Sequence, residues 1–378
     1  MKNKMKLNST LFLALMVCFG NSFAQKTPSK KSVLAAMQAT NNYFKRTWPD
    51  PGKSITTNTT RPSNIWTRAV YYEGLMGLYA TKPVKADYEY AVDWGQKHSW
   101  GLRGGIQTRN ADNHAAGQTY IDLYNIDQQP ERIKDIKASI DLMMASGKID
   151  DWTWIDALQM GMPVFAKLGV LYKDNAYYEY MYKMYTHSRN VEGGGLYNAK
   201  DGLWWRDKSF VPPYKEPNGE DCYWSRGNGW VVAALVRVLD IMPKDAPHRD
   251  EYLQMYKDML KALVPIQRTD GFWNASLHDA NNFGGKETSG TALFVYGMAW
   301  GINQGLIDPA VYKPVLVKAW NAMVKDAVTK DGSLGFVQGT GKEPKDGQPV
   351  TYTSRPDFED YGLGCFLLAG TEVYKLKK

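Results

Sequence analysis

The chain has 378 residues, of which 44% are hydrophobic, and its 46 lysines and arginines outnumber 39 acidic residues, giving a formal net charge of +7. The basic residues are scattered along the sequence. This argues against nucleic acid as a partner, because nucleic-acid-binding proteins gather such residues in a patch or stripe. Three cysteines are too few for a disulfide framework.

Residues 1–24 have the pattern of a signal peptide. Three early lysines precede an apolar run from Leu11 to Phe19, and Ser22-Phe23-Ala24 forms a small-x-small cleavage site. The run is too short to cross a bilayer. We therefore expect cleavage after Ala24 and no membrane insertion of the product. We expect an exported protein, with the periplasm as its destination and a net charge of +4 once three lysines are removed.

Two kinds of helical pattern alternate along residues 25–378. One kind is amphipathic and charged, at about 32–46, 84–98, 131–145, 173–188, 249–266 and 311–327. The other is apolar nearly all round, at about 65–80, 114–125, 154–169, 226–240, 288–305 and 359–375. A helix that is apolar on every side is buried. The alternation therefore predicts an all-α fold, an (α/α)6 barrel of six helical hairpins. No linker composition interrupts the pattern, so we expect a single domain.

The connectors that lead from an outer to an inner helix repeat a phrase, Asp-Gly followed by aromatic residues, at 201, 270 and 331. Such a phrase is typical of a turn leading into extended chain, so we expect short strands in the rim loops. These connectors must share one rim, which gathers six tryptophans around a mouth: Trp152, Trp154, Trp204, Trp205, Trp224 and Trp273. Aromatic rings at a mouth suit sugar rings; alternatively, they plug the end of the barrel.

Residues 150–162 read "DDWTWIDALQMGM" and place Asp156 among apolar neighbours at a helix start. Thr153-x-x-Asp156 also fits a capping box, which would make the acid structural. Arg226 is unusual too, because the dipole at a helix N-terminus disfavours a cation. Both residues therefore break a local rule of helix design, and such violations favour a functional site.

Several chemistries are disfavoured by missing motifs. The sequence has no His-Glu-x-x-His, no Cys-x-x-Cys and no paired histidines, so we expect neither a catalytic metal nor another cofactor. Among the histidines, only His114 lies on the predicted rim beside an acid, two residues after Asp112, and it is a candidate for substrate binding. Asp150 and Asp151 are more typical of turn and capping residues than of a catalytic pair.

Four segments together resemble the unsaturated rhamnogalacturonyl hydrolases of glycoside hydrolase family 105: "WTWIDALQMGMPVFAKLG", "CYWSRGNGWVVAALVRVLD", "ETSGTALFVYGMAWGINQGLI" and "DYGLGCFLLAG". The unsaturated glucuronyl hydrolases of family 88 look more distantly similar. The resemblance implies an (α/α)6 barrel and the hydration of a vinyl ether. The substrate would be a lyase-generated oligosaccharide that ends in a 4,5-unsaturated uronic acid, galacturonyl or glucuronyl. An acid would protonate C4, water would add at C5, and the hemiketal would open.

Position by position, the resemblance makes Asp156 the general acid and base. Asp112 becomes a second carboxylate that holds sugar hydroxyls. Arg226 and Trp230, four residues apart on one helix face, match substrate-contacting residues.

The resemblance also places Trp154 as a ring beside the acid and Tyr72 as a ring that stacks on the sugar. Arg206 stands where a histidine is expected, which changes how the uronate carboxylate would be bound. Apolar neighbours and a second carboxylate favour a protonated acid, so we expect Asp156 to hold its proton, whereas a capping role would favour the ionised form.

Two alternatives remain open. An inverting glycosidase on the same barrel would use Asp150 with Asp151, or Asp112 with Glu287, on saturated glycosides. A non-catalytic sugar-binding protein would retain the rim but never turn over a substrate. The sequence leaves the parent polysaccharide and the leaving sugar undetermined.

Overall fold

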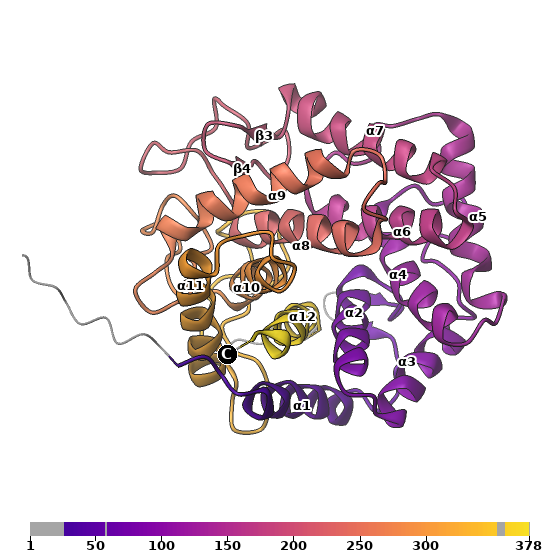
Figure 1. The fold of residues 1–378 in the computed structure, drawn as a ribbon, viewed down its shortest axis with the longest axis horizontal. Helices are drawn as coiled ribbons and strands as arrows, with labels where there is room; N and C mark the ends of the chain where they lie inside the picture. The colour runs from indigo at the N-terminus through magenta and orange to yellow at the C-terminus, as the bar shows by residue number, and fades with distance from the viewer. Residues whose placement is uncertain (1–25, 57–58, 354–359, 378) are drawn as a thin grey trace, which may run out of the picture.

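The structure is a computed structural model that describes residues 26–56, 59–353 and 360–377, so the predicted signal peptide lies outside the described residues. Its α-helices form two concentric rings (Figure 1). The outer ring consists of α1 (Lys30–Thr47), α3 (Lys85–Lys97), α5 (Glu131–Ser146), α7 (Ala176–Asn190), α9 (Arg249–Leu263) and α11 (Pro309–Ala322). The inner ring consists of α2 (Trp66–Thr81), α4 (Ala111–Ile126), α6 (Asp156–Tyr172), α8 (Ser225–Ile241), α10 (Thr288–Asn303) and α12 (Tyr361–Lys375). The predicted (α/α)6 barrel is confirmed.

Burial explains why the two sequence patterns separate into two rings. In α10 every residue from Thr288 to Gly301 is buried, as expected of a helix that is apolar all round. In α9 the buried side chains recur at helical spacing on one face, from Tyr252 to Leu263. Among the helices of the described residues, none is long and apolar enough to cross a membrane.

The inner ring closes because its first and last helices pack tightly together. Each inner helix contacts two inner neighbours, and α12 contacts α2. A Cβ atom on Gly74 would lie 2.6 Å from the carbonyl oxygen of Gly364, and one on Gly364 would lie 2.1 Å from that of Val70. Any larger residue at these two glycines would push α2 and α12 apart.

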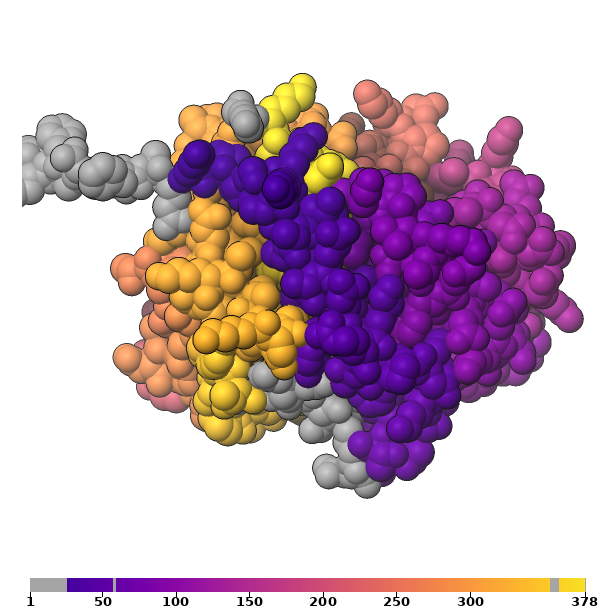
Figure 2. Space-filling model, turned by 90° about the horizontal axis from the view of Figure 1, so that it is seen from below, coloured from indigo at the N-terminus to yellow at the C-terminus, as the bar shows by residue number. Residues whose placement is uncertain are grey.

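The first helix of the outer ring also contacts the C-terminal third of the chain. Figure 2 shows the indigo helix α1 between the following α2–α3 segment and the orange and yellow C-terminal third. Helix α1 packs against α12, and the guanidinium of Arg46 donates to the carbonyl oxygen of Asp331 at 2.9 Å. The barrel is therefore closed by contacts between segments that are about as distant in sequence as the chain allows.

The glycine of the repeated Asp-Gly phrase has a positive φ at all three places. Gly202, Gly271 and Gly332 have φ values of +67°, +96° and +93°, a region that favours glycine. The first leads into β4 (Leu203–Trp204), which pairs antiparallel with β3 (Tyr197–Asn198). A second short pair joins β1 (Ile55–Thr56) and β2 (Thr60–Arg61). The prediction of short strands in the rim loops is confirmed.

Candidate active site

The two predicted catalytic acids begin adjacent inner helices. Asp112 lies in the first turn of α4, after the N-cap residue Asn110, and Asp156 is the first residue of α6. Helices α4 and α6 pack against each other. Burial, followed by the negative charge of Asp156, raises the pKa of Asp112 to about 7, although the positive charges of Arg206 and Arg103 oppose that rise. Asp112 therefore holds a proton close to neutral pH.

Asp156 is in a different electrostatic position, because an arginine pairs with it. The Nε of Arg206 lies 3.1 Å from Oδ2 of Asp156, and its Nη1 lies 2.8 Å from Oδ2 of Asp207. Backbone contacts fix the connector that carries Arg206. The amide of Ile155 donates to the carbonyl of Arg206 at 2.9 Å, and Trp154 and Asp207 form an isolated antiparallel β-bridge. The expected apolar neighbours are present, since Ile155 and Leu158 are buried, but the sequence analysis did not foresee the ion pair with Arg206.

The capping alternative for Asp156 is also wrong. Helix α6 begins at Asp156 with Ile155 in the N-cap position, and no side chain caps it. Thr153, the predicted cap, is exposed. Within the described part of the chain, the hydrogen bond that the Asp156 carboxylate accepts comes from Arg206. The carboxylate is thus available to a ligand rather than fixed to backbone amides.

The other acids considered from the sequence have structural partners. Glu287 is 1% exposed and caps α10 by accepting two backbone N–H bonds at 2.9 and 2.7 Å. Asp151 forms an ion pair with Arg109, and Asp150 lies 3.5 Å from the ammonium group of Lys148. Such contacts satisfy these carboxylates and disfavour the two acid pairs of an inverting glycosidase.

Arg226 is committed to a rim loop. Its side chain is buried, and its two terminal nitrogens donate to the carbonyl oxygens of Gln338 at 2.9 Å and Gly339 at 2.7 Å. The guanidinium also lies over the rings of Trp224 and Tyr361, at 4.5 and 5.1 Å. These contacts stabilise a cation at a helix start. They also place Arg226 beneath the loop instead of free for a uronate.

Most of the predicted aromatic mouth is packed inside the protein. Trp154 is partly exposed, whereas the other five tryptophans assigned to the mouth are buried: Trp152, Trp204, Trp205, Trp224 and Trp273. Those five rings therefore pack within the protein and do not line an open mouth. Trp230 is also fully buried, with its ring edge-to-face with Trp66 at 6.2 Å. Trp66, at the start of α2, is partly exposed at the same end, and the sequence analysis missed it.

Two further predicted binding residues face away from the site. Tyr72 is fully buried, with its ring stacked on Trp94 of α3 at 4.0 Å, so a sugar cannot reach it. His114 is also fully buried, and its Nε2 contacts Oγ of Ser139 on α5 at 3.0 Å. Burial lowers the pKa of His114 to about 4, so the ring is neutral. Both predictions are wrong because these residues lie on the faces of α2 and α4 that pack against the outer ring.

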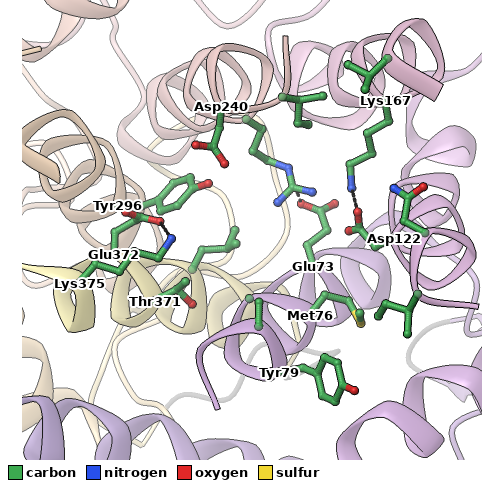
Figure 3. A pocket seen from close by; sticks show the side chains of 18 of the residues that line it. Glu73, Met76, Tyr79, Asp122, Lys167, Asp240, Tyr296, Thr371, Glu372 and Lys375 are labelled. Carbon is green, nitrogen blue, oxygen red and sulfur yellow. Dashed lines mark hydrogen bonds and ion pairs between the residues drawn. The ribbon is translucent and has the colours of Figure 1, made fainter. Parts of the chain in front are cut away.

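The opposite end of the barrel carries a cavity of about 850 Å³, lined by the C-terminal parts of the inner helices (Figure 3). Lys167 forms an ion pair with Asp122 there, and Glu73 lies 3.7 Å from Arg237. Burial raises the pKa of Glu73 to about 7. In this cavity Asp122 and Glu73 both face basic partners, and none of the site residues predicted from the sequence lines it. Nowhere in the described ranges do three His, Cys, Asp or Glu residues lie close enough to hold a metal ion.

The double helical ring, with two carboxyl groups at the starts of adjacent inner helices, has the architecture of an α/α-barrel enzyme. The family model of Glycosyl Hydrolase Family 88 matches residues 37–377, so the chain belongs to this family. This confirms the family relationship, and the enzyme class, that the sequence motifs predicted.

Several relatives cover most of the chain. An "Unsaturated 3S-rhamnoglycuronyl hydrolase" from Formosa agariphila is 32% identical over 334 residues, 83% of this chain and 85% of its own. A protein of the same name from an Alteromonas species is 31% identical and covers 82% of this chain and 78% of its own. The solved structure of "Glycosyl hydrolase family 88 from Bacteroides vulgatus" has a TM-score of 0.83 and 32% identity, covering 92% of this chain and all of its own.

Proposed function

We propose that the protein removes a terminal 4,5-unsaturated uronic acid from lyase-generated oligosaccharides by hydrating the C4=C5 enol ether. The observation that carries this proposal is the unequal pair of carboxyl groups at the rim. Asp112 is protonated near neutral pH, and Asp156 lies beside it in an ion pair with Arg206. A carboxyl group that keeps its proton near neutral pH, with a second acid close enough to influence it, supplies the proton that the protonation of an alkene carbon requires. The names of the relatives support the same reaction.

The reaction balances with one water and no cofactor. The carboxyl of Asp156, reprotonated from Asp112, gives its proton to C4, and the electron pair of the C4=C5 bond forms the new C4–H bond. The resulting cation is shared between C5 and the ring oxygen. Water adds at C5 and returns a proton to the carboxylate pair. The hemiketal then opens, and the glycosidic bond is lost without a nucleophile at the anomeric carbon.

The leaving sugar is proposed to be a rhamnose. Two relatives, each more than 30% identical, carry the name "rhamnoglycuronyl hydrolase". Trp66 and Trp154 are partly exposed rings at the same end of the barrel as the acids, and they would stack on the sugar faces. We further propose that residues 25–378 act as one catalytic domain in the periplasm, on the strength of the export pattern in residues 1–24.

The test is a panel of oligosaccharides released by lyases from different uronate-containing polysaccharides. The conjugated double bond absorbs in the ultraviolet, so hydration removes the absorbance. We expect loss of absorbance with uronyl-rhamnose products and none with the Asp156→Asn variant. Cleavage of saturated glycosides with the absorbance unchanged would instead identify an inverting glycosidase. Binding without any turnover would identify a sugar-binding protein.

A further inference from the structure

The side chain of Arg206 stands between the catalytic pair and a third acid. It bridges Asp156 and Asp207 at 3.1 and 2.8 Å, and about 20% of its side chain is exposed. Its backbone is fixed by the bridge to residues 154 and 155, so the side chain can change partners without moving the connector. The guanidinium of Arg206 is therefore ion-paired with the proposed proton donor and is still accessible to solvent.

This contact conflicts with the task of Asp156. An arginine beside a carboxylate stabilises its ionised form, whereas a proton donor must become neutral before it can act. The charged groups near the pair are Asp112 on α4, Asp207, and the exposed Arg103, which lowers the pKa of Asp112 from the other connector. Arg206 is the cation among them that hydrogen-bonds to Asp156. The hydrogen bond from Arg206 must therefore be broken before Asp156 can act as a proton donor.

The carboxylate of the substrate can compete with Asp156 for the guanidinium of Arg206. A 4,5-unsaturated uronic acid has a carboxylate on C5, next to the carbon that is protonated. The planar guanidinium of arginine pairs with carboxylates through two parallel hydrogen bonds. Arg226, the arginine expected from the sequence to contact the substrate, donates instead to the carbonyls of Gln338 and Gly339. Arg206 hydrogen-bonds to one of the acids, whereas Arg103 acts on Asp112 through its charge.

We propose that Arg206 exchanges partners when substrate binds: it leaves Asp156 for the uronate carboxylate, and Asp156 then takes up the proton that it delivers to C4. This proposal rests on the proposed function. The proton passes from Asp112 to Asp156, one O–H bond breaking as another forms, so no charge is created within the pair. Asp207 keeps its contact with Nη1 of Arg206 and anchors the guanidinium during the exchange. The negative charge of the substrate thereby frees Asp156 to take up a proton, whereas a neutral sugar leaves the Arg206–Asp156 pair in place.

The experiment compares the unsaturated uronyl disaccharide with its methyl ester, which lacks the carboxylate charge. We expect the wild type to prefer the free acid by about 100-fold in kcat/KM, the range measured for breaking a hydrogen-bonded charge pair. In Arg206→Gln the preference collapses to a few-fold, because activity falls on the acid but not on the ester. Arg206→Lys restores part of the preference.

Arg189→Gln is the matched control, because Arg189 forms an ion pair with Glu251 of α9 and not with Asp112 or Asp156. It removes an ion-paired, partly buried arginine and should leave the acid-to-ester preference as in the wild type. An equal loss on acid and ester in Arg206→Gln would overturn the exchange and make Arg206 a structural residue. Turnover of neither substrate by the wild type would refute the proposed function itself, which is a distinguishable result.

Discussion

Replacing Asp112 with asparagine should stabilise the protein while it impairs catalysis. Asp112 has a pKa of about 7 in the folded protein against an ordinary value of 3.8. A raised pKa means that the folded state resists ionisation of this acid. Its contribution to stability is complete below pH 3.8 and is lost as the pH rises through 7. The difference corresponds to about 4 kcal/mol. Solvent screening of the partly exposed side chain reduces this to about 2 kcal/mol.

The assay is urea unfolding of the wild type and Asp112→Asn at about pH 4 and about pH 8. We expect nearly equal free energies of unfolding at the lower pH, and a gain of about 2 kcal/mol for the variant at the higher pH. Asp87→Asn is the control, because Lys45 and Asn41 donate to that carboxylate and its loss should destabilise the protein. If Asp112→Asn were destabilising at both pH values, the inference that burial raises the pKa of Asp112 would be refuted.

Three further outcomes follow from the site. Asp156→Asn should keep the fold and lose about 10³-fold in kcat on the unsaturated substrate, measured by absorbance; near-normal turnover would end its assignment as the acid. Trp66→Ala should raise KM, measured by enzyme kinetics, with little change in thermal stability. Trp230→Ala leaves a cavity at a buried position and should cost about 3–5 kcal/mol of stability, measured by calorimetry. Arg226→Gln should make the loop around Gln338 sensitive to limited proteolysis before global unfolding, and an unchanged cleavage rate would argue against its anchoring role.

The barrel could be predicted because its pattern is local. Alternation of one-sided and all-round apolar helices is written in residues three and four apart, and so is the position of each helix. The Asp-Gly phrases were readable for the same reason: Gly202, Gly271 and Gly332 require a backbone region that other residues avoid. The observed helices therefore lie within a few residues of the predicted ranges.

The predictions for side-chain roles were less successful because they depended on which layer each residue faces. Tyr72 and His114 lie on helices whose ends reach the rim, but their rings point into the gap between the two helical layers. Since both faces of an inner helix are apolar, hydrophobic periodicity carries no information about which face lines the site. Trp66 was missed for the converse reason: nothing near it distinguishes an open ring from a buried one.

The pairing of Arg206 with Asp156 is the clearest case of information that becomes visible only after folding. Fifty residues separate the two side chains, and the contact depends on the backbone bridge between Trp154 and Asp207. From the sequence, Arg206 was an unexplained replacement of an expected histidine. A histidine there would lose much of its charge near neutral pH, whereas an arginine is always charged. An arginine therefore keeps Asp156 paired at every working pH, and only a competing anion can release it. An arginine at position 206 therefore suits a substrate that carries its own carboxylate, because that carboxylate is the competing anion.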